Sequence, residues 1–212
     1  MLRNKKTKCI AFSQKTREIK DLATIRLYGN DLPWVDEVDH LGCTLQSDVK
    51  MTSDIRRKRG KFIGKVNSIL QELHFSPPEV LMKVIESQAT SFFGSPIWNL
   101  TSKDVDKIFK SWNVMLRKVF NLDRCTHRYL LEDITNTRHV LPKLMAKTQT
   151  FYESLGNSPK PGIRFLFGVS TGDNRTTTGQ NTTKITKLCE GTPNKATIKR
   201  TAKYVPIPPE ES

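Results

Sequence analysis

Hydrophobic residues recur at helical spacing across residues 49–75, the longest regular pattern in the chain. Intervals of three, four or seven residues place such side chains on one face of an α-helix. The pattern therefore predicts a long amphipathic helix with a polar outer face. Five residues form its apolar face: Ile55, Phe62, Val66, Ile69 and Leu73.

The next stretch, residues 76–120, shows the same periodicity twice, with a break at residues 94–100. Ser76 is followed by a proline and then by a glutamate three residues on, which is typical of a capped helix start. Thr101, with an aspartate three residues on, predicts the start of a second helix. Residues 76–120 are therefore expected to form a helical hairpin.

Each predicted helix of this hairpin has one broad apolar face, and both faces are expected to contribute to a shared core. The first face consists of Val80, Leu81, Val84, Ile85, Ala89, Phe92 and Phe93. The second consists of Val105, Ile108, Phe109, Trp112, Met115, Leu116 and Val119.

Residues 1–48 alternate between polar and apolar positions, as β-strands do. We expect strands at residues 7–12 and 24–28, a turn at Gly29-Asn30-Asp31, and a third short element around Val38 and Leu45. Three short strands without a helix of their own cannot close a core. This segment is therefore expected to be the edge of a sheet whose other strands lie outside the chain.

The rest of the chain divides by composition. Residues 121–156 keep helical spacing, whereas residues 157–212 are rich in Ser, Thr, Asn, Gly, Pro and Lys. Such a composition predicts a poorly folded basic tail with one short apolar docking segment, residues 163–167. The expected fold class is α+β, mainly α: a β edge (1–48), a helical domain (49–156) and a low-complexity tail.

Charge narrows the function. The 212 residues carry a net charge of +14, and 36% of them are hydrophobic. A strongly basic chain favours an acidic partner, with nucleic acid ahead of a membrane surface. No apolar run is long enough to span a bilayer or to form a signal peptide, so we expect an intracellular protein of the nucleus or cytoplasm.

Basic side chains follow two of the predicted helices, on sides away from the apolar faces. They are candidate contacts to nucleic-acid phosphates, although a solvated helix surface and, for residues 56–61, a nuclear-localisation signal are alternatives. The candidates are Arg57, Lys61, Lys65, Lys103, Lys107, Lys110 and Arg117.

Two strings in the helical hairpin resemble a known family. They are Phe93-Gly94-Ser95-Pro96-Ile97-Trp98 and Ser111-Trp112-Asn113 followed by Leu116-Arg117. They look like the region downstream of the polymerase core in non-LTR retrotransposon reverse transcriptases of the RTE/BovB-like kind. The resemblance implies that residues 49–156 form a thumb-like domain. Trp98 and Trp112 are also expected to be core residues, and this expectation is compatible with the resemblance.

Further strings resemble the same family in the same order. Residues 4–12 are similar to the segment after the catalytic Asp-Asp strand, where Lys6 occupies the place of a lysine proposed to protonate departing pyrophosphate. His40-Leu41-Gly42 resembles the primer-grip hairpin, with His in place of the commoner Tyr. Residues 173–181, DNRTTTGQN, resemble a string near the end of these polyproteins.

The catalytic groups of a polymerase are missing from this chain. Polymerisation needs paired aspartates that hold two Mg²⁺ ions, and the sequence contains no Asp-Asp pair. We therefore expect no catalytic residue apart from the candidate Lys6, and Mg²⁺ only in an intact polymerase. A zinc site from His40, Cys43, Cys125 and His127 is a further possibility, set against separate cysteines and histidines.

Two functional hypotheses follow. In the first, the chain is the truncated palm edge and thumb of a reverse transcriptase, which grips RNA or an RNA–DNA duplex through backbone phosphates without its own catalysis. In the second, it is a free-standing basic helical module that docks nucleic acid or protein. A retroelement remnant without function is a third reading.

Overall fold

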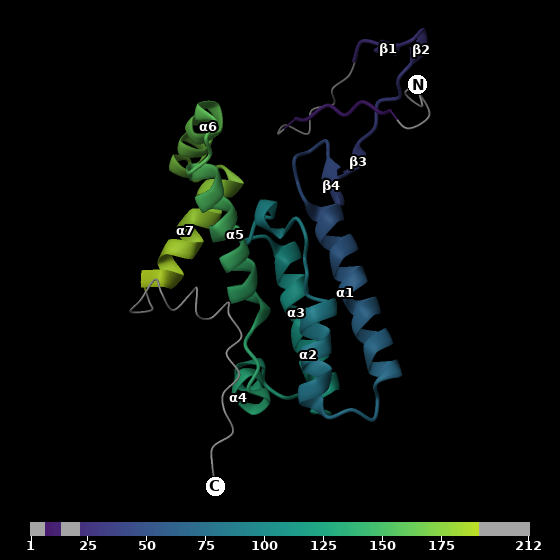
Figure 1. Ribbon diagram of the computed structural model, residues 1–212, viewed down its shortest axis with the longest axis vertical. Coiled ribbons are helices and arrows are strands. Elements are labelled where there is room, and N and C mark those ends of the chain that lie inside the picture. Colours follow the sequence, from purple (N-terminus) through teal and green to yellow (C-terminus); the bar gives the residue numbers. More distant parts are fainter. Residues whose placement is uncertain (1–6, 14–21, 191–212) are drawn as a thin grey trace. The chain divides into compact units, whose positions relative to one another are not determined.

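The computed structural model describes residues 7–13 and 22–190, and the chain divides into two compact units. We call Met1–Lys58 the N-terminal unit and Arg59–Ser212 the helical unit. The N-terminal unit holds two small antiparallel sheets, and the described part of the helical unit is built from helices (Figure 1). The α+β, mainly α, fold class is confirmed.

The first sheet pairs β1 (Arg26–Leu27) with β2 (Asn30–Asp31) in an antiparallel hairpin. The turn consists of Tyr28 and Gly29, whose φ angles are 50° and 77°. Positive φ at both central residues is typical of a type I′ turn, which matches the twist of the strands. The predicted turn is thus present but lies one residue earlier, because Asn30 and Asp31 belong to β2.

The second sheet pairs β3 (Glu37–His40) with β4 (Cys43–Gln46). Its turn is Leu41-Gly42, with φ angles of 47° and 79°. Val38 lies opposite Leu45 and His40 opposite Cys43. The short element expected around residues 38–45 is therefore a tight hairpin.

The segment at residues 7–13 is less regular than predicted. It forms one isolated parallel bridge, between Cys9 and Trp34. The Cys9 amide donates to the Pro33 carbonyl (3.0 Å), and the Val35 amide donates to the Cys9 carbonyl (2.9 Å). Alternation of side chains predicted an extended backbone here, but it could not specify a partner strand.

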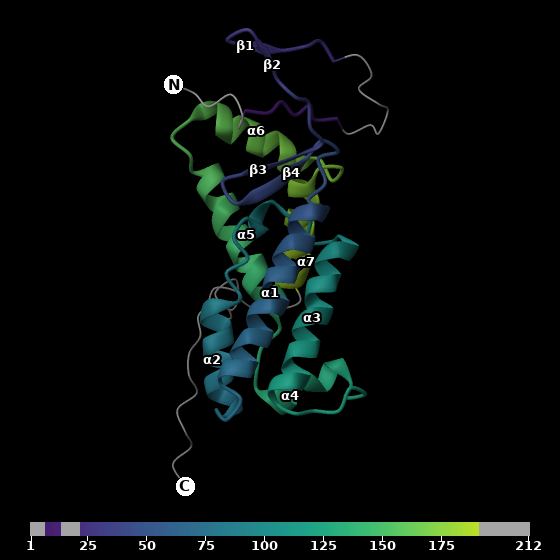
Figure 2. The same ribbon diagram turned by 90° about the vertical axis from the view of Figure 1, so that its right-hand side faces the viewer.

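Three helices form the first part of the helical unit: α1 (Thr52–Glu72), α2 (Pro78–Gln88) and α3 (Lys103–Val119). α1 begins in the N-terminal unit and continues into the helical unit. Within the helical unit it runs alongside α2 and α3, which appear on either side of it in Figure 2. Arg59 contacts Ser111, and Asn67 contacts Lys118, so α1 and α3 run parallel.

Aromatic side chains form the centre of this core. The Phe62 ring stacks on Trp112 with centroids 6.2 Å apart, and it also contacts Phe92 (5.6 Å). Phe92 meets Trp98 edge-on at 6.1 Å. The predicted face of α3 is buried except for the half-buried Phe109, which confirms the helical periodicity.

The predicted helix caps are wrong by one residue. α2 begins after Pro77, with no side-chain cap, so Ser76 does not cap it. Ser102 and not Thr101 caps α3, since its hydroxyl accepts from the Val105 amide (3.3 Å). α2 also ends at Gln88, which leaves Phe93 exposed. Adjacent Ser and Thr residues offer the same capping chemistry, and sequence alone cannot choose between them.

Further elements lie before and after α3 in the chain. A 3-10 turn, η2 (Ser95–Ile97), joins α2 to α3, and η3 (Arg128–Leu130) leads into α4 (Leu131–Thr135) and then α5 (Val140–Gly156). α5 packs against η2 and α3. The expectation of helices across residues 121–156 is confirmed.

The expectation of a poorly folded tail is wrong for residues 161–190. They form α6 (Pro161–Gly172) and α7 (Thr177–Glu190), which pack against each other, and α6 packs on α5. Asn181 of α7 is fully buried. Its side chain donates to the Trp98 carbonyl (2.8 Å) and to the Tyr152 hydroxyl (3.1 Å), and it accepts from the Leu100 amide (2.8 Å).

Residues 173–181 form the turn between α6 and α7 and the first part of α7, and several of them have a structural role there. The Asp173 carboxylate pairs with Arg175 (3.0 Å), and the Thr176 hydroxyl accepts from the Gly179 amide (3.0 Å). A Cβ on Gly179 would lie 2.2 Å from the Asp173 carbonyl oxygen, so only glycine fits. Tertiary contacts thus override the weak helix propensity of Thr, Gly and Asn.

Candidate nucleic-acid interface

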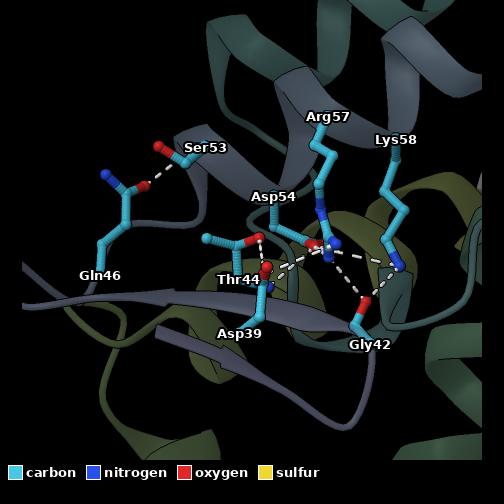
Figure 3. Close-up of polar contacts among 8 residues, drawn as sticks. All are labelled: Asp39, Gly42, Thr44, Gln46, Ser53, Asp54, Arg57 and Lys58. Atoms are coloured by element: carbon cyan, nitrogen blue, oxygen red, sulfur yellow. Dashed lines mark hydrogen bonds and ion pairs between the residues drawn. The ribbon is translucent and has the colours of Figure 1, made fainter. Parts of the chain in front are cut away.

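A buried carboxylate joins the β3–β4 hairpin to the first turns of α1 (Figure 3). Asp54 is fully buried. It accepts hydrogen bonds from the Thr44 amide and from Arg57 Nη2, both at 3.1 Å, and Lys58 Nζ lies 3.9 Å away. A buried carboxylate is stable only when it is paired and hydrogen-bonded, and Asp54 meets both conditions.

The two cations beside Asp54 also hold the hairpin turn. Arg57 Nη2 and Lys58 Nζ each donate to the Gly42 carbonyl at 2.8 Å (Figure 3). Arg57 Nη1 lies 3.5 Å from Asp39. Arg57 was expected to reach phosphates from a free helix surface, but its guanidinium is occupied within the N-terminal unit. The assignment of Arg57 as a phosphate contact is therefore corrected. The sequence could not reveal these partners, because Asp39 and Gly42 come close to Arg57 only in the folded chain.

This cluster fixes the tip that resembles a primer grip. His40 is exposed and Leu41 is 80% exposed, at the turn whose Gly42 carbonyl is clamped. The tip is therefore presented to solvent on a braced hairpin. Whether it contacts a nucleic acid stays a prediction.

Arg117 does not belong to the outer face of α3. Its Nη2 and Nε donate to the Thr126 carbonyl (2.6 and 3.3 Å), and its Nη1 donates to the Asn113 carbonyl (3.1 Å). The side chain is half-buried and anchors the loop after α3. The predicted phosphate contact of Arg117 is therefore corrected, because its guanidinium already donates to backbone carbonyls within the fold.

Three predicted lysines of α3 are exposed as expected: Lys103, Lys107 and Lys110. Lys107 pairs with Asp104 (2.7 Å) in a contact within the helix that is open to solvent. Exposed pairs of this kind contribute little and exchange readily for another anion. Together the three form a cationic face on α3, opposite its buried face.

Lys61 and Lys65 are exposed on α1, but they lie on another side of the molecule. At about 100° per residue, both lie about 120–160° around α1 from Arg59 and Asn67, which contact α3. The two lysine groups predicted to act together therefore do not form one continuous surface. They are separate candidate contacts.

Two cations where α1 meets α3 were not predicted from the sequence. The half-buried Arg59 donates through Nε to Ser111 Oγ (2.7 Å), and the exposed Lys118 reaches Asn67 (3.3 Å). Ser111 follows Lys110 directly, and Lys118 lies further along α3. The partner residues are 52 and 51 positions away, so no local pattern could reveal them.

Other basic side chains of the helical unit serve its interior. Lys143 pairs with Glu86 (2.6 Å) and lies over the Trp112 ring (5.8 Å). Burial, together with the charge of Lys143, lowers the pKa of Lys147. Burial also lowers the pKa of Lys184, which donates to the Leu100 carbonyl (2.7 Å). The net charge therefore overstates the number of cations available to a ligand.

Lys6 lies outside the described residues. Within residues 7–13 and 22–190, no group of three or more His, Cys, Asp and Glu side chains is arranged to hold a metal ion. In the same part of the chain, no helix is both long enough and apolar enough to cross a membrane.

Comparison with protein-family models found no match, and neither the curated proteins nor the solved structures gave a significant one.

Proposed function

We propose that this protein binds template–primer nucleic acid through backbone phosphates, as the palm-edge and thumb part of a reverse transcriptase that lacks its own catalytic aspartates. The proposed ligand is RNA or an RNA–DNA duplex. Phosphate contacts give affinity without sequence preference, and lysines on a rigid helix can supply them.

One observation carries the proposal. Lys103, Lys107 and Lys110 form an exposed cationic face on α3, a helix whose opposite face is locked into the core by Trp112. Lys118 extends the basic character along the same helix. A straight row of cations on a braced helix can follow a phosphate backbone, because neither the helix nor its position has to be ordered on binding.

The test is fluorescence anisotropy with a labelled RNA–DNA hybrid, titrated at several salt concentrations. The test variant combines Lys103→Gln, Lys107→Gln and Lys110→Gln. Each lost phosphate contact removes about 0.9 from the slope of log affinity against log salt, so we expect a loss of about two to three units. Affinity should fall equally for unrelated sequences.

A matched control combines Lys83→Gln, Arg138→Gln and Lys187→Gln. These residues are exposed on α2, on the loop before α5 and on α7, and the control loses the same net charge. It should leave the slope within about one unit of the wild type. Equal slopes for both triple variants, or no binding by the folded wild type at low salt, would reject the proposal.

A free-standing helical module is the second candidate. The hydrophobic core favours it, because all buried hydrophobic side chains among the described residues except Ile55 belong to the helical unit. It predicts that residues 1–48 can be removed by limited proteolysis without loss of stability in the remainder. A remainder that unfolds or aggregates would favour the first candidate.

A further inference from the structure

A pair of stacked rings lies on the surface of the helical unit, at η3. The rings of His127 and Tyr129 have centroids 5.4 Å apart and planes inclined by 26°. His127 is exposed and Tyr129 is 70% exposed, so most of the tyrosine ring is open to solvent. We call these two residues the η3 ring pair. Its open ring surface is available for stacking with a further flat ring.

The backbone that carries the η3 ring pair is held in place on both sides. On one side Arg117 of α3 donates through Nη2 to the Thr126 carbonyl (2.6 Å). On the other side the Leu130 amide donates to the His127 carbonyl (3.1 Å), and the next residue, Leu131, is buried. The ring pair therefore belongs to an ordered turn between α3 and α4, which lie next to each other in Figure 2.

An available cation lies between the two rings in the sequence. Arg128 is exposed, and in the described part of the chain it forms no hydrogen bond and no ion pair. The carboxylates near it in the sequence are Asp123, Glu132 and Asp133, and none of them pairs with it. Asp123 instead accepts from the Cys125 amide (2.6 Å). The donors of Arg128 are therefore available to an anionic ligand.

Another exposed ring pair provides the comparison. The rings of His74 and Phe75 lie 3.7 Å apart between their centroids, and Phe75 is 91% exposed. Residues 66–82 around this pair contain two glutamates and no lysine or arginine. An exposed ring pair thus occurs with a cation at η3 and without one after α1. The combination at η3 indicates a ligand that has both a flat ring and a negative charge.

An unpaired nucleotide has these two properties, because its base can stack on an aromatic ring while its phosphate accepts from an arginine. Proteins that bind single-stranded nucleic acid combine aromatic rings with cations in this way. Bases inside a duplex already stack on their neighbours and cannot offer a face. A second copy of this chain is a poor occupant, since each copy carries +14.

We propose that the η3 ring pair binds an unpaired nucleotide of a single-stranded RNA segment, by stacking of its base on Tyr129 and contact of its phosphate with Arg128. This inference rests on the proposed function and extends it. Lys103, Lys107 and Lys110 lie on the helix that leads into the η3 turn, so a strand bound along α3 can continue to the ring pair.

The experiment measures fluorescence anisotropy of the full chain with three labelled ligands. The first is a blunt RNA–DNA hybrid, and the second is the same hybrid with a single-stranded RNA overhang of about six nucleotides. The third has an abasic overhang of the same length, which keeps the phosphates but has no bases. Comparison of the two overhangs separates stacking from charge.

We expect the wild type to bind the ordinary overhang about tenfold more tightly than the abasic one. Tyr129→Ala should lose this preference with an unchanged circular dichroism spectrum, whereas Tyr129→Trp should keep it. The matched control is Phe75→Ala, which removes an equally exposed ring stacked on a histidine and should keep the preference. Equal affinity for the two overhangs, or equal losses in Tyr129→Ala and Phe75→Ala, would overturn the proposal.

The contact of Arg128 has its own test. Arg128→Gln should reduce the slope of log affinity against log salt by about 0.7 for the ordinary overhang, and Lys187→Gln, an exposed control on α7, should not. An unchanged slope in Arg128→Gln would contradict the phosphate contact.

The blunt hybrid distinguishes the two proposals. If the lysines of α3 do not bind phosphates, their triple variant keeps its slope with the blunt hybrid, but the Tyr129-dependent preference for the ordinary overhang remains. If the ring pair does not bind a base, blunt-hybrid binding stays sensitive to the lysines while that preference is absent. A wild type that binds neither overhang ligand would overturn the inference as well.

Discussion

The two units of the molecule are stabilised in different ways. Among the described residues of the N-terminal unit, Ile55 is the one hydrophobic side chain that is fully buried, beside the buried polar Thr44 and Asp54. The helical unit instead buries a continuous set of aromatic and aliphatic side chains around Trp98 and Trp112. Polar contacts of Asp54 and Ser53 with the β3–β4 hairpin hold the first unit, and the second unit depends on packing.

Each unit is therefore sensitive to a different kind of substitution. Removing volume from a packed core destabilises it through lost transfer energy and a residual cavity. Removing one acceptor from a polar cluster leaves its donors without that partner, but a donor that keeps a second acceptor loses less. Substitutions in the helical unit should therefore act globally, and those at Asp54 should act locally.

Trp112→Ala should have the largest effect. The ring is fully buried and stacks on Phe62, and truncating such a side chain costs about 3–5 kcal/mol of unfolding free energy. Urea unfolding monitored by circular dichroism measures the change. Val114→Ala on the same helix is the control, since Val114 is 51% exposed and should cost less than about 0.5 kcal/mol. Similar midpoints for both variants would contradict the packed core.

Asn181→Ala should come next. It leaves the Leu100 amide and the Trp98 carbonyl without their buried partner, which costs about 2–3 kcal/mol. Limited proteolysis should then cut within residues 157–190 much faster than in the wild type. Asn174→Ala, the control, changes an exposed asparagine in residues 173–181, and the protease should cut this variant as slowly as the wild type. Equal cutting of both variants would mean that α7 is not held by Asn181.

Asp54→Ala should have a smaller and local effect. Arg57 and Lys58 keep the Gly42 carbonyl as an acceptor, while the buried Thr44 amide loses its acceptor, so we expect about 1–2 kcal/mol. Hydrogen exchange should speed up at the β3–β4 amides while the core amides of α3 keep their protection. Asp48→Ala, which removes a carboxylate 3.3 Å from Lys50, is the control. Loss of protection throughout both units would break the contrast between them.

Sequence reasoning succeeded where the signal was local. The apolar face of α3 follows from spacing alone, because amphipathic periodicity depends only on helix geometry. The hairpin turn at Gly29 was also placed within a residue, since few residues tolerate positive φ. These features need no knowledge of the rest of the chain.

It failed where the partner is remote. Arg57 and Arg117 looked like exposed cations, and each is engaged by a carbonyl or carboxylate that only folding brings near. The helices at residues 161–190 were missed because their composition resembles a loop. Their docking depends on one asparagine, Asn181, whose three contacts lie 29 to 83 residues away. Propensity and composition contain no information about such contacts.

The smallest expected effect concerns a helix cap that depends on pH. His139 Nδ1 accepts from the Leu141 amide (3.2 Å) at the start of α5, so the cap needs the neutral imidazole. Burial and the nearby Arg128 lower the pKa of His139 below its ordinary value of 6.5. The folded state thus binds a proton less readily than the unfolded chain, and stability falls as the pH drops below about 6.5.

The comparison variant is His139→Asn, which can cap the helix but does not titrate. Its unfolding free energy should match the wild type at pH 7.5 and exceed it at pH 5, by no more than about the 1 kcal/mol of a typical cap. Urea unfolding at both pH values measures the difference. Because the cap lies in the packed helical unit, the change should appear in the global transition. A pH effect confined to the β3–β4 amides would instead assign the titration to the N-terminal unit.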